Sequence, residues 1–269
     1  MNSLVIGETS QLAQFFPKEY VKISARNINY DLLLSTNWDR VFICFGVSSK
    51  NIEDKELYDA INFKLTLDII NKFKWVSNKI VIYSTCELWN RCDGSVDLNT
   101  PYDFYDTPYI NSKHKLTNFI NNNKNEYDNV IIMFPFNFNS PFRSNNFLFG
   151  KIFNSIINKT KIEIGDTYFY RDLIHPSYVV KTSISENVNK LVGSGRLTFV
   201  NDFIRDLYSH YDLSYEILVI EDRKTFKEYN KINEFYLRSD ICDYPYSTLL
   251  SETINDINKC IYGNKWTNN

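Results

Sequence analysis

A tyrosine and a lysine stand four residues apart in the segment TPYINSKHK, at Tyr109 and Lys113. Side chains at this spacing lie on the same face of an α-helix, so both could line one site. A tyrosine hydroxyl has a pKa of about 10, and a neighbouring ammonium group lowers that pKa by favouring the phenolate. Such a pair could exchange a proton with a carbonyl or hydroxyl group at neutral pH. The alternative is an ordinary solvated helix face, and the rest of the chain must decide between the two.

A turn near the start of the chain could hold phosphate. The run SLVIG at 3–7 predicts a strand, and the apolar spacing of SQLAQFF at 10–16 predicts a helix. Between them Gly7, Ser10 and Ala13 are small, which would let backbone N–H groups approach a pyrophosphate at the helix N-terminus. A plain turn between a strand and a helix is the alternative. The residues expected to contact a dinucleotide in this turn are Gly7, Thr9, Ser10, Gln11 and Leu12.

The end of the second predicted strand, 20–24, indicates which dinucleotide is bound. An acidic residue here would bind the ribose hydroxyls of NAD, and the segment ISARN contains none. Arg26 could instead pair with a 2′-phosphate, because its planar guanidinium suits an anion. A plain surface arginine is the alternative. We therefore expect NADP(H) as the cofactor in preference to NAD(H).

The first half of the chain alternates predicted strands and helices. The strands at 40–46, 79–85 and 129–136 are apolar throughout, as strands buried on both faces are. The helices at 55–73 and 109–123 carry apolar residues at three- and four-residue steps. This alternation predicts an α/β fold with a Rossmann-type, doubly wound parallel sheet, in which ligands bind outside the carboxyl ends of the strands.

The second half is less regular. It is predicted to contain helices at 145–157 and 199–211, the second opened by Asn201 or Asp202, and a short strand at 162–165. A smaller C-terminal α/β region is therefore expected after a boundary near residue 141.

Five segments occur in the order found in the extended short-chain dehydrogenase/reductase superfamily, in its nucleotide-sugar branch. The chain resembles that family in GETSQLA (7–13), ICFG (43–46), YSTCELW (83–89), PYINSK (108–113) and YRDLIHPSYVV (170–180). The resemblance covers roughly residues 3–195. It implies an NAD(P)-dependent enzyme whose small-molecule partner is a nucleoside-diphosphate sugar. It divides the chain into an NADP-binding domain at 1–141 and a sugar-nucleotide-binding region at 142–269. Some later segments, at about 172–195, are expected to return to the NADP-binding domain.

The resemblance also assigns residue roles. Tyr109 and Lys113 match the family's Tyr-x-x-x-Lys pair, Thr85 matches its catalytic Ser/Thr, and Asn62 matches an asparagine usual in the helix at 55–73. Residues implied beside the cofactor, besides the turn and Arg26, are Phe45, Gly46, Tyr109 and Lys113. Residues implied beside the sugar nucleotide are Thr85, Cys86, Glu87, Asn137 and Arg171. For Arg171 the alternative is a structural surface pair with Asp172.

One departure from the family narrows the reaction. Cys86 and Glu87 stand where the family's dehydratases carry an Asp-Glu pair, and a thiol with a pKa of about 8.5 replaces a carboxylic acid poorly. Together with an NADP site, this predicts an NADPH-dependent reductase of a nucleoside-diphosphate-linked 4-keto-deoxy sugar. The resemblance implies a role in deoxy-sugar biosynthesis for surface polysaccharide, and a homodimer formed through the helices at 55–73 and 109–123.

Two rival functions stay open. The first is a nucleotide-sugar epimerase with tightly bound NAD. The second is a non-catalytic protein that binds a dinucleotide or a sugar nucleotide. It is suggested by Ser10 and Ala13, which replace glycines, and by Phe134 and Asn139, where the family often has arginine and tyrosine.

Composition argues against other classes of protein. A net charge of −2 and a pI of about 6.0 give no footprint for nucleic acid. The three histidines lack metal-ligand spacing, so no metal is expected. The five cysteines form no Cys-x-x-Cys pair and suit reduced thiols in the cytoplasm. No apolar run reaches the roughly 18 residues of a membrane span, and no signal peptide is recognised, so a cytoplasmic protein is expected.

Overall fold

The computed structural model describes residues 2–48, 54–222, 236–241 and 243–263, which leaves Cys242 outside the described residues. Their contacts divide the chain into two compact units. The first unit comprises Met1–Trp89, Pro101–Pro135 and Val179–Val192. The second unit comprises Asn90–Thr100, Phe136–Tyr178 and Gly193–Asn269.

The first unit is built on a six-stranded parallel sheet with the order β10–β6–β4–β3–β1–β2. Every residue of β1 and β6 is buried, because helices and turns cover both faces of the sheet. This confirms the predicted α/β fold with a Rossmann-type parallel sheet. The strands are β1 (Ser3–Ile6), β2 (Val21–Ile23), β3 (Trp38–Ile43), β4 (Ser77–Tyr83), β6 (Val130–Pro135) and β10 (Lys190–Val192).

Strand β2 forms one edge of this sheet. The common Rossmann order, 3-2-1-4-5-6, places a further strand outside the second one. Here the residues between β2 and β3, 24–37, form loops and the short helix α1 (Tyr30–Leu34) instead. The strand order therefore reverses between β1 and β3, and ligands of open α/β sheets bind at the carboxyl ends of strands at such a point.

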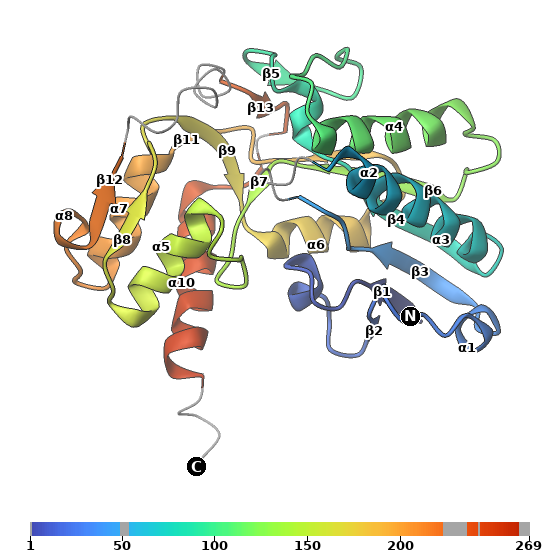
Figure 1. Ribbon diagram of the computed structural model, residues 1–269, viewed down its shortest axis with the longest axis horizontal. Coiled ribbons are helices and arrows are strands. Elements are labelled where there is room, and N and C mark those ends of the chain that lie inside the picture. The colour runs from blue at the N-terminus through green and yellow to red at the C-terminus, as the bar shows by residue number, and fades with distance from the viewer. Residues whose placement is uncertain (1, 49–53, 223–235, 242, 264–269) are drawn as a thin grey trace. The chain divides into compact units, whose positions relative to one another are not determined.

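The helical segment predicted at 55–73 is continuous but not uniform. It consists of α2 (Lys55–Tyr58), a π-helix η2 (Asp59–Leu65) and α3 (Thr66–Phe73). Helix α4 (Pro108–Asn122) begins at Thr107, whose side chain accepts a hydrogen bond from the backbone N–H of Ile110. Helix α4 packs against α2 and η2, and Figure 1 shows α2 next to α4.

One face of the sheet is covered by the first crossover and by α6 (Pro176–Ser185), which begins in the second unit and continues in the first. Alternate residues of β3 mark this face. The ring of Phe42 lies 4.6 Å from that of Phe16, and Arg40 donates a hydrogen bond to Ser183 O at 3.3 Å.

The helix predicted at 10–16 is wrong in type and length. The chain forms only a 3-10 helix, η1 (Leu12–Phe15), between β1 and β2. Residues 7–20 must make the whole crossover, and Pro17 cannot donate a backbone hydrogen bond, so there is little room for an α-helix.

The second unit contains three small sheets, β11–β9–β7, β12–β8 and β13–β5. The helix predicted at 199–211 begins at Val200 with Phe199 as its N-cap, so its predicted opening at Asn201 or Asp202 is wrong. Asn201 is instead buried, and its side chain donates to Thr167 Oγ1 at 2.7 Å. Among the described residues, no helix has the length and apolar character needed to cross a membrane.

The bounds of the remaining elements are η3 (Cys86–Trp89), β5 (Ser95–Val96), β7 (Asn137–Phe138), α5 (Leu148–Asn158), β8 (Ile162–Ile164), β9 (Tyr170–Ile174), β11 (Leu197–Phe199), α7 (Val200–His210), α8 (Tyr215–Leu218), β12 (Val219–Glu221), β13 (Arg238–Ser239) and α10 (Tyr246–Tyr262).

Candidate active site

Tyr109 and Lys113 lie on successive turns at the start of α4, in the first unit. The Lys113 ammonium donates a hydrogen bond to Tyr83 O at 2.7 Å, at the last residue of β4. The ring of Tyr109 packs edge-on against that of the buried Tyr58, with 6.4 Å between the ring centroids. Both members of the pair are half-buried, so the face that they share is not a fully solvated one.

Burial lowers the pKa of the Lys113 ammonium from its usual value of 10.5 to about 8. At neutral pH the group still carries its charge, but it loses the charge over a range in which an ordinary lysine keeps it. A cation at this place favours the phenolate form of a neighbouring tyrosine.

Thr85 lies two residues after the carbonyl group that Lys113 contacts. Its side chain is buried, and its Oγ1 accepts a hydrogen bond from the backbone N–H of Glu87 at 3.2 Å. A hydroxyl that accepts one hydrogen bond can still donate its own proton to a substrate oxygen. The end of β4 is held against α4 by Ser84 Oγ and Thr117 Oγ1, which lie 2.9 Å apart.

Asn62 connects the loop after β3 to the first turn of α4. Its Oδ1 accepts from the Val47 N–H at 2.8 Å, and its Nδ2 donates to Val47 O and to Ser112 Oγ, both at 3.0 Å. Ser112 Oγ in turn donates to Tyr109 O at 2.7 Å. Asn62 lies within the π-helix η2, and the wider turn of a π-helix is a frequent feature of functional sites.

Two glycines bring the first turn and the loop after β3 close together. Gly7 has φ +103°, and a Cβ there would lie 2.8 Å from Phe45 N. A Cβ on Gly46 would lie 3.1 Å from Asn62 Oδ1 and 3.7 Å from Lys113 Nζ. A side chain on Gly46 would enter the space next to Lys113, and one on Gly7 would meet the backbone of the loop after β3. The absence of both side chains suits a flat, extended ligand such as a dinucleotide.

The turn after β1 is fixed by its own hydrogen bonds. The N–H groups of Gly7 and Glu8 both donate to Ile23 O, at 2.8 and 3.0 Å. Ser10 Oγ accepts from the Ala13 N–H at 3.2 Å, so the serine side chain holds a backbone donor in the first turn of η1, whose N-cap position is Gln11. Thr9 is exposed, Gln11 is half-buried and Leu12 is buried in the core, so Leu12 can offer a ligand only its backbone.

Arg26 follows β2 and is exposed. Its backbone N–H donates to Ser24 Oγ at 3.2 Å. Within the part of the chain that the structure describes, its guanidinium has no hydrogen bond or ion pair, which leaves the group available to an anion.

The predicted substrate residues fall in both units. Cys86 and Glu87 belong to η3 beside Thr85, where the thiol is buried and the carboxylate is half-buried. Asn137 and Arg171 belong to the second unit, on the paired strands β7 and β9. The Arg171 guanidinium donates to Tyr170 O at 2.7 Å and lies 4.5 Å from the centroid of the Phe169 ring.

The alternative interpretation of Arg171, in which it forms a surface pair with Asp172, is wrong. Asp172 is fully buried, and its carboxylate accepts hydrogen bonds from backbone N–H groups of Ser194, Gly195 and Ser239 at 2.6–3.0 Å. The two neighbouring residues therefore have separate environments, and Asp172 is a structural carboxylate.

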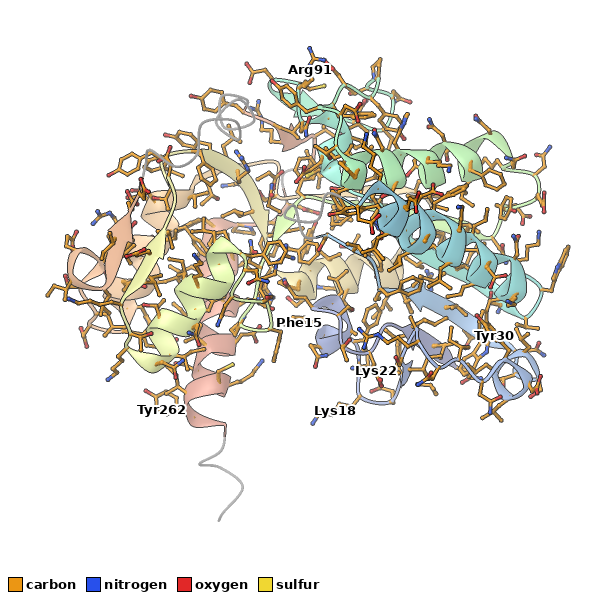
Figure 2. All side chains as sticks on the ribbon, in the orientation of Figure 1. Phe15, Lys18, Lys22, Tyr30, Arg91 and Tyr262 are labelled. Carbon is orange, nitrogen blue, oxygen red and sulfur yellow. The ribbon has the colours of Figure 1, made fainter. Side chains whose placement is uncertain are left out.

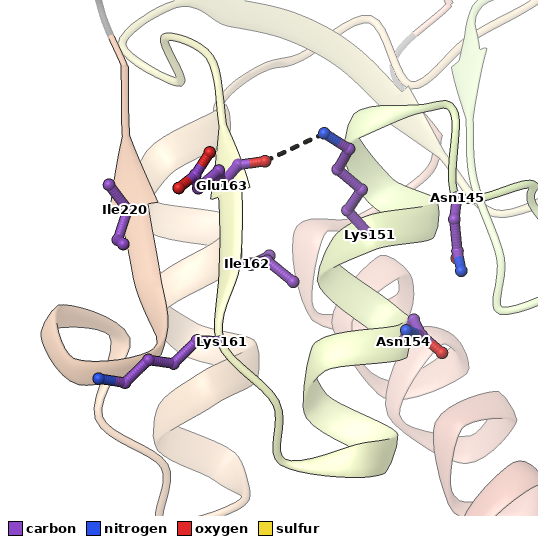
Figure 3. Close-up of a pocket in the computed structure, with 7 residues that line it drawn as sticks. All are labelled: Asn145, Lys151, Asn154, Lys161, Ile162, Glu163 and Ile220. Atoms are coloured by element: carbon purple, nitrogen blue, oxygen red, sulfur yellow. Dashed lines mark hydrogen bonds between the residues drawn. The ribbon is translucent and has the colours of Figure 1, made fainter.

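The second unit also carries a groove of about 500 Å³, drawn in Figure 3. Lys151 crosses its wall and donates to Glu163 O at 3.0 Å. Neither Asn137 nor Arg171 lines it, so no predicted site residue depends on it. Among the described residues there is also no group of three or more histidine, cysteine or carboxylate side chains that could hold a metal ion. The groove is lined by Asn145, Lys151, Asn154, Lys161, Ile162, Glu163 and Ile220.

Sequence reasoning missed two contributors to the site. Tyr58 supports the ring of Tyr109, and its only sequence signal is an apolar position in the helix at 55–73. Lys22 of β2 donates to two carbonyl groups of the first crossover. The signal available in the sequence was Lys22 itself, a charged residue within the short predicted strand at 20–24.

No protein-family model matches the chain, and no curated protein matches its sequence. Solved structures do match it. UDP-N-acetylglucosamine 4-epimerase from Methanobrevibacter ruminantium M1 has a TM-score of 0.76 at 13% identity and covers 98% of both chains. UDP-glucuronic acid 4-epimerase from Bacillus cereus, in complex with NAD, has a TM-score of 0.75 at 14% identity, again over 98% of both chains.

RMD from Pseudomonas aeruginosa, complexed with NADPH, has a TM-score of 0.70 at 14% identity over 95% of this chain and 99% of that one. These structural neighbours are of the extended short-chain dehydrogenase/reductase type, the family that the five sequence segments resemble. At these identities the likeness establishes the fold, and the reaction has to be argued from the site.

Proposed function

We propose that this protein is an NADPH-dependent reductase of a nucleoside-diphosphate-linked 4-keto-deoxy sugar, with Tyr109 as the proton donor. The observation that carries the proposal is the contact of the Lys113 ammonium with Tyr83 O at the carboxyl end of β4, two residues before Thr85 and one helical turn from Tyr109. Asn62 and Ser112 hold that arrangement from the neighbouring loop and helix.

The roles of the three side chains follow from their chemistry. When bound, the reduced nicotinamide supplies the hydride to the carbonyl carbon. Tyr109 donates its hydroxyl proton to the carbonyl oxygen, so that the ketone becomes an alcohol and the tyrosine a phenolate. The Lys113 ammonium stabilises that phenolate, and the Thr85 hydroxyl donates a hydrogen bond to the same substrate oxygen.

The cofactor is proposed to lie along the turn from Gly7 to Leu12 and beside Phe45 and Gly46. Arg26 would pair with a 2′-phosphate, which supports NADP(H) over NAD(H). Charge-assisted hydrogen bonds contribute about 1.5–3 kcal/mol, so Arg26→Ala should weaken NADPH binding at least about tenfold. NADH binding, titrated by fluorescence with the same variant, should stay unchanged.

The sugar nucleotide is proposed to contact Cys86 and Glu87 beside the reactive carbon, and Asn137 and Arg171 in the second unit. Arg171 suits a diphosphate because a guanidinium binds phosphate oxygens through two parallel hydrogen bonds. Its cation–π contact with Phe169 supports the guanidinium group. A reductase of this class would serve deoxy-sugar and polysaccharide biosynthesis.

A nucleotide-sugar 4-epimerase with bound NAD is the second candidate. It is favoured by the fold that the chain shares with two 4-epimerases. An epimerase returns its hydride to the substrate, whereas a reductase consumes one NADPH for each turnover. Purified protein should therefore be screened with NADPH against 4-keto sugars on GDP, dTDP, CDP and UDP carriers. Isomer formation without loss of the absorbance of reduced nicotinamide would replace our proposal with the epimerase.

The homodimer expected from the family resemblance stays a prediction. On the exposed side of the helices concerned, Asp59 forms ion pairs with Lys64, at 3.1 Å, and Lys115, at 2.5 Å. A dimer through this face would have to bury these charges, which costs free energy unless the partner supplies matching groups. Light scattering after size exclusion would give the mass, and a Lys115→Glu variant would test whether this face is used.

A further inference from the structure

The turn proposed to bind the cofactor lies in a part of the fold that has little regular secondary structure around it. It belongs to the crossover between β1 and β2, which holds only the 3-10 helix η1, and β2 is the edge strand of the sheet formed by the described residues. The last turn of η1 contains no basic residue of its own. Carbonyl groups at a helix end need partners from elsewhere, and a cation near them is favourable.

Lys22 of β2 supplies those partners. Its ammonium donates to Ala13 O and to Phe16 O, both at 2.9 Å, so it closes the end of η1. The parallel register of β1 and β2 sets Lys22 beside Val5, below the same crossover. Burial lowers the pKa of Lys22, as expected for an ammonium that points inward from a strand. Figure 2 marks Lys22 together with Lys18, which lies on the same crossover.

The next residue of the strand fixes the other end of the turn. Ile23 O accepts from the N–H groups of Gly7 and Glu8. Two consecutive residues of β2 therefore hold the crossover at its start and at its finish, and residues 9–12 lie between the two attachments. A binding loop that is already held in its bound shape loses less entropy when its ligand arrives.

We propose that Lys22 is a positioning residue for the cofactor, which holds the phosphate-binding turn in shape through Ala13 O and Phe16 O. The inference rests on the proposed function, since it assumes that the turn binds a nicotinamide dinucleotide. Lys22 touches neither the substrate nor the cofactor in this account, and it acts only through the backbone of the crossover.

The test compares NADPH affinity with folding in a set of variants. Lys22→Met keeps the length of the side chain and removes its three N–H donors, and it should raise the Kd for NADPH about tenfold. Lys22→Arg keeps the charge and the donors and should bind within about threefold of the wild type. Lys18→Met is the matched control, because Lys18 is exposed on the same crossover, and it should bind like the wild type.

Two further measurements separate positioning from general stability. The thermal midpoint of Lys22→Met should stay close to that of the wild type, while hydrogen exchange of the amides in residues 7–16 becomes faster. If Lys22→Met does not fold, Lys22→Gln carries the same prediction for the Kd, because its side chain is uncharged and too short to replace the ammonium that contacts both Ala13 O and Phe16 O.

An unchanged Kd in folded Lys22→Met, or an equal loss in Lys18→Met, overturns this inference and leaves the proposed function intact. Failure of the wild type to bind either NADPH or NADH would overturn the proposed function, and this inference with it.

Discussion

The polar side chains of the two units differ in their hydrogen-bond partners. In the first unit, Lys113 and Thr85 each make a hydrogen bond that leaves further donor atoms able to meet a ligand. In the second, the carboxylate of Asp172 is enclosed by backbone N–H groups and by the Ser194 hydroxyl at 2.7 Å. A polar residue in a family segment can therefore support the fold or do chemistry, and its hydrogen-bond partners tell which.

The neighbours Arg171 and Asp172 show the difference within one strand. The carboxylate holds the turn after β10 and the last residue of β13, and a Cβ on Gly193 would lie only 2.7 Å from its Oδ2. The guanidinium beside it rests on an aromatic ring. Removing the Asp172 carboxylate should lower the stability of the second unit, whereas changes at Tyr109 should lower only the rate of the reaction proposed for the first unit.

The largest effect is expected from Tyr109→Phe, which removes the proposed proton donor and keeps the ring that packs on Tyr58. General acid catalysis contributes about 10²- to 10⁴-fold, so kcat should fall by that factor. The Kd for NADPH should stay within about twofold, as a fluorescence titration would show. Turnover at the wild-type rate would mean that another group donates the proton.

Asp172→Asn should be the most destabilising change in the second unit. The new amide would turn one N–H group toward backbone donors, and an unsatisfied buried donor costs about 1–3 kcal/mol. Urea unfolding would measure the loss, with Asp240→Asn, at an exposed carboxylate, as the control. Retained NADPH affinity would locate the damage in the second unit, and stability equal to that of the control would contradict the role given to Asp172.

Asn62→Ala should have an intermediate effect on the first unit. It removes the three hydrogen bonds that join the loop after β3 to α4, so kcat/KM should fall by about tenfold as Tyr109 and Gly46 lose their fixed spacing. Steady-state kinetics would measure this, with Asn122→Ala at the exposed end of α4 as the control. A stable variant with unchanged kcat/KM would show that the loop is held by other contacts.

The smallest effect concerns pH and Lys113. Because its pKa in the folded protein is about 8, kcat/KM should decline above about pH 8 as the ammonium loses its proton. Between about pH 8 and 10.5, Lys113 is protonated in the unfolded chain but largely deprotonated in the folded protein, so the unfolded state binds more protons than the folded state. The free energy of unfolding should therefore rise with pH across that window, and this gain should be lost as pH falls through 8.

Lys113→Met should lack both dependences. Profiles of rate and of unfolding free energy against pH, measured side by side for the two proteins, test this. Identical stability profiles for wild type and variant would contradict the lowered pKa.

Most of the first unit could be predicted from the sequence because its signals are local. Strands buried on both faces appear as continuous apolar runs, and Tyr109 and Lys113 show their relation through one helical turn. The π-helix η2 could not be foreseen, because apolar spacing at three and four residues fits an α-helix equally well. Lys22 was missed because its partners come from a neighbouring element.

The second unit was harder to predict because its pairings are distant. Strand β5 pairs with β13, and each has only two residues, so neither has a recognisable pattern. Asp172 likewise receives hydrogen bonds from residues 22, 23 and 67 positions away. Such contacts exist only once the chain has folded.

The most direct test of the central claim is the stoichiometry between NADPH oxidised and 4-keto sugar nucleotide converted, measured for the wild type in one reaction mixture. The account predicts one NADPH consumed for each alcohol formed. Conversion of the sugar nucleotide without net loss of NADPH would contradict it.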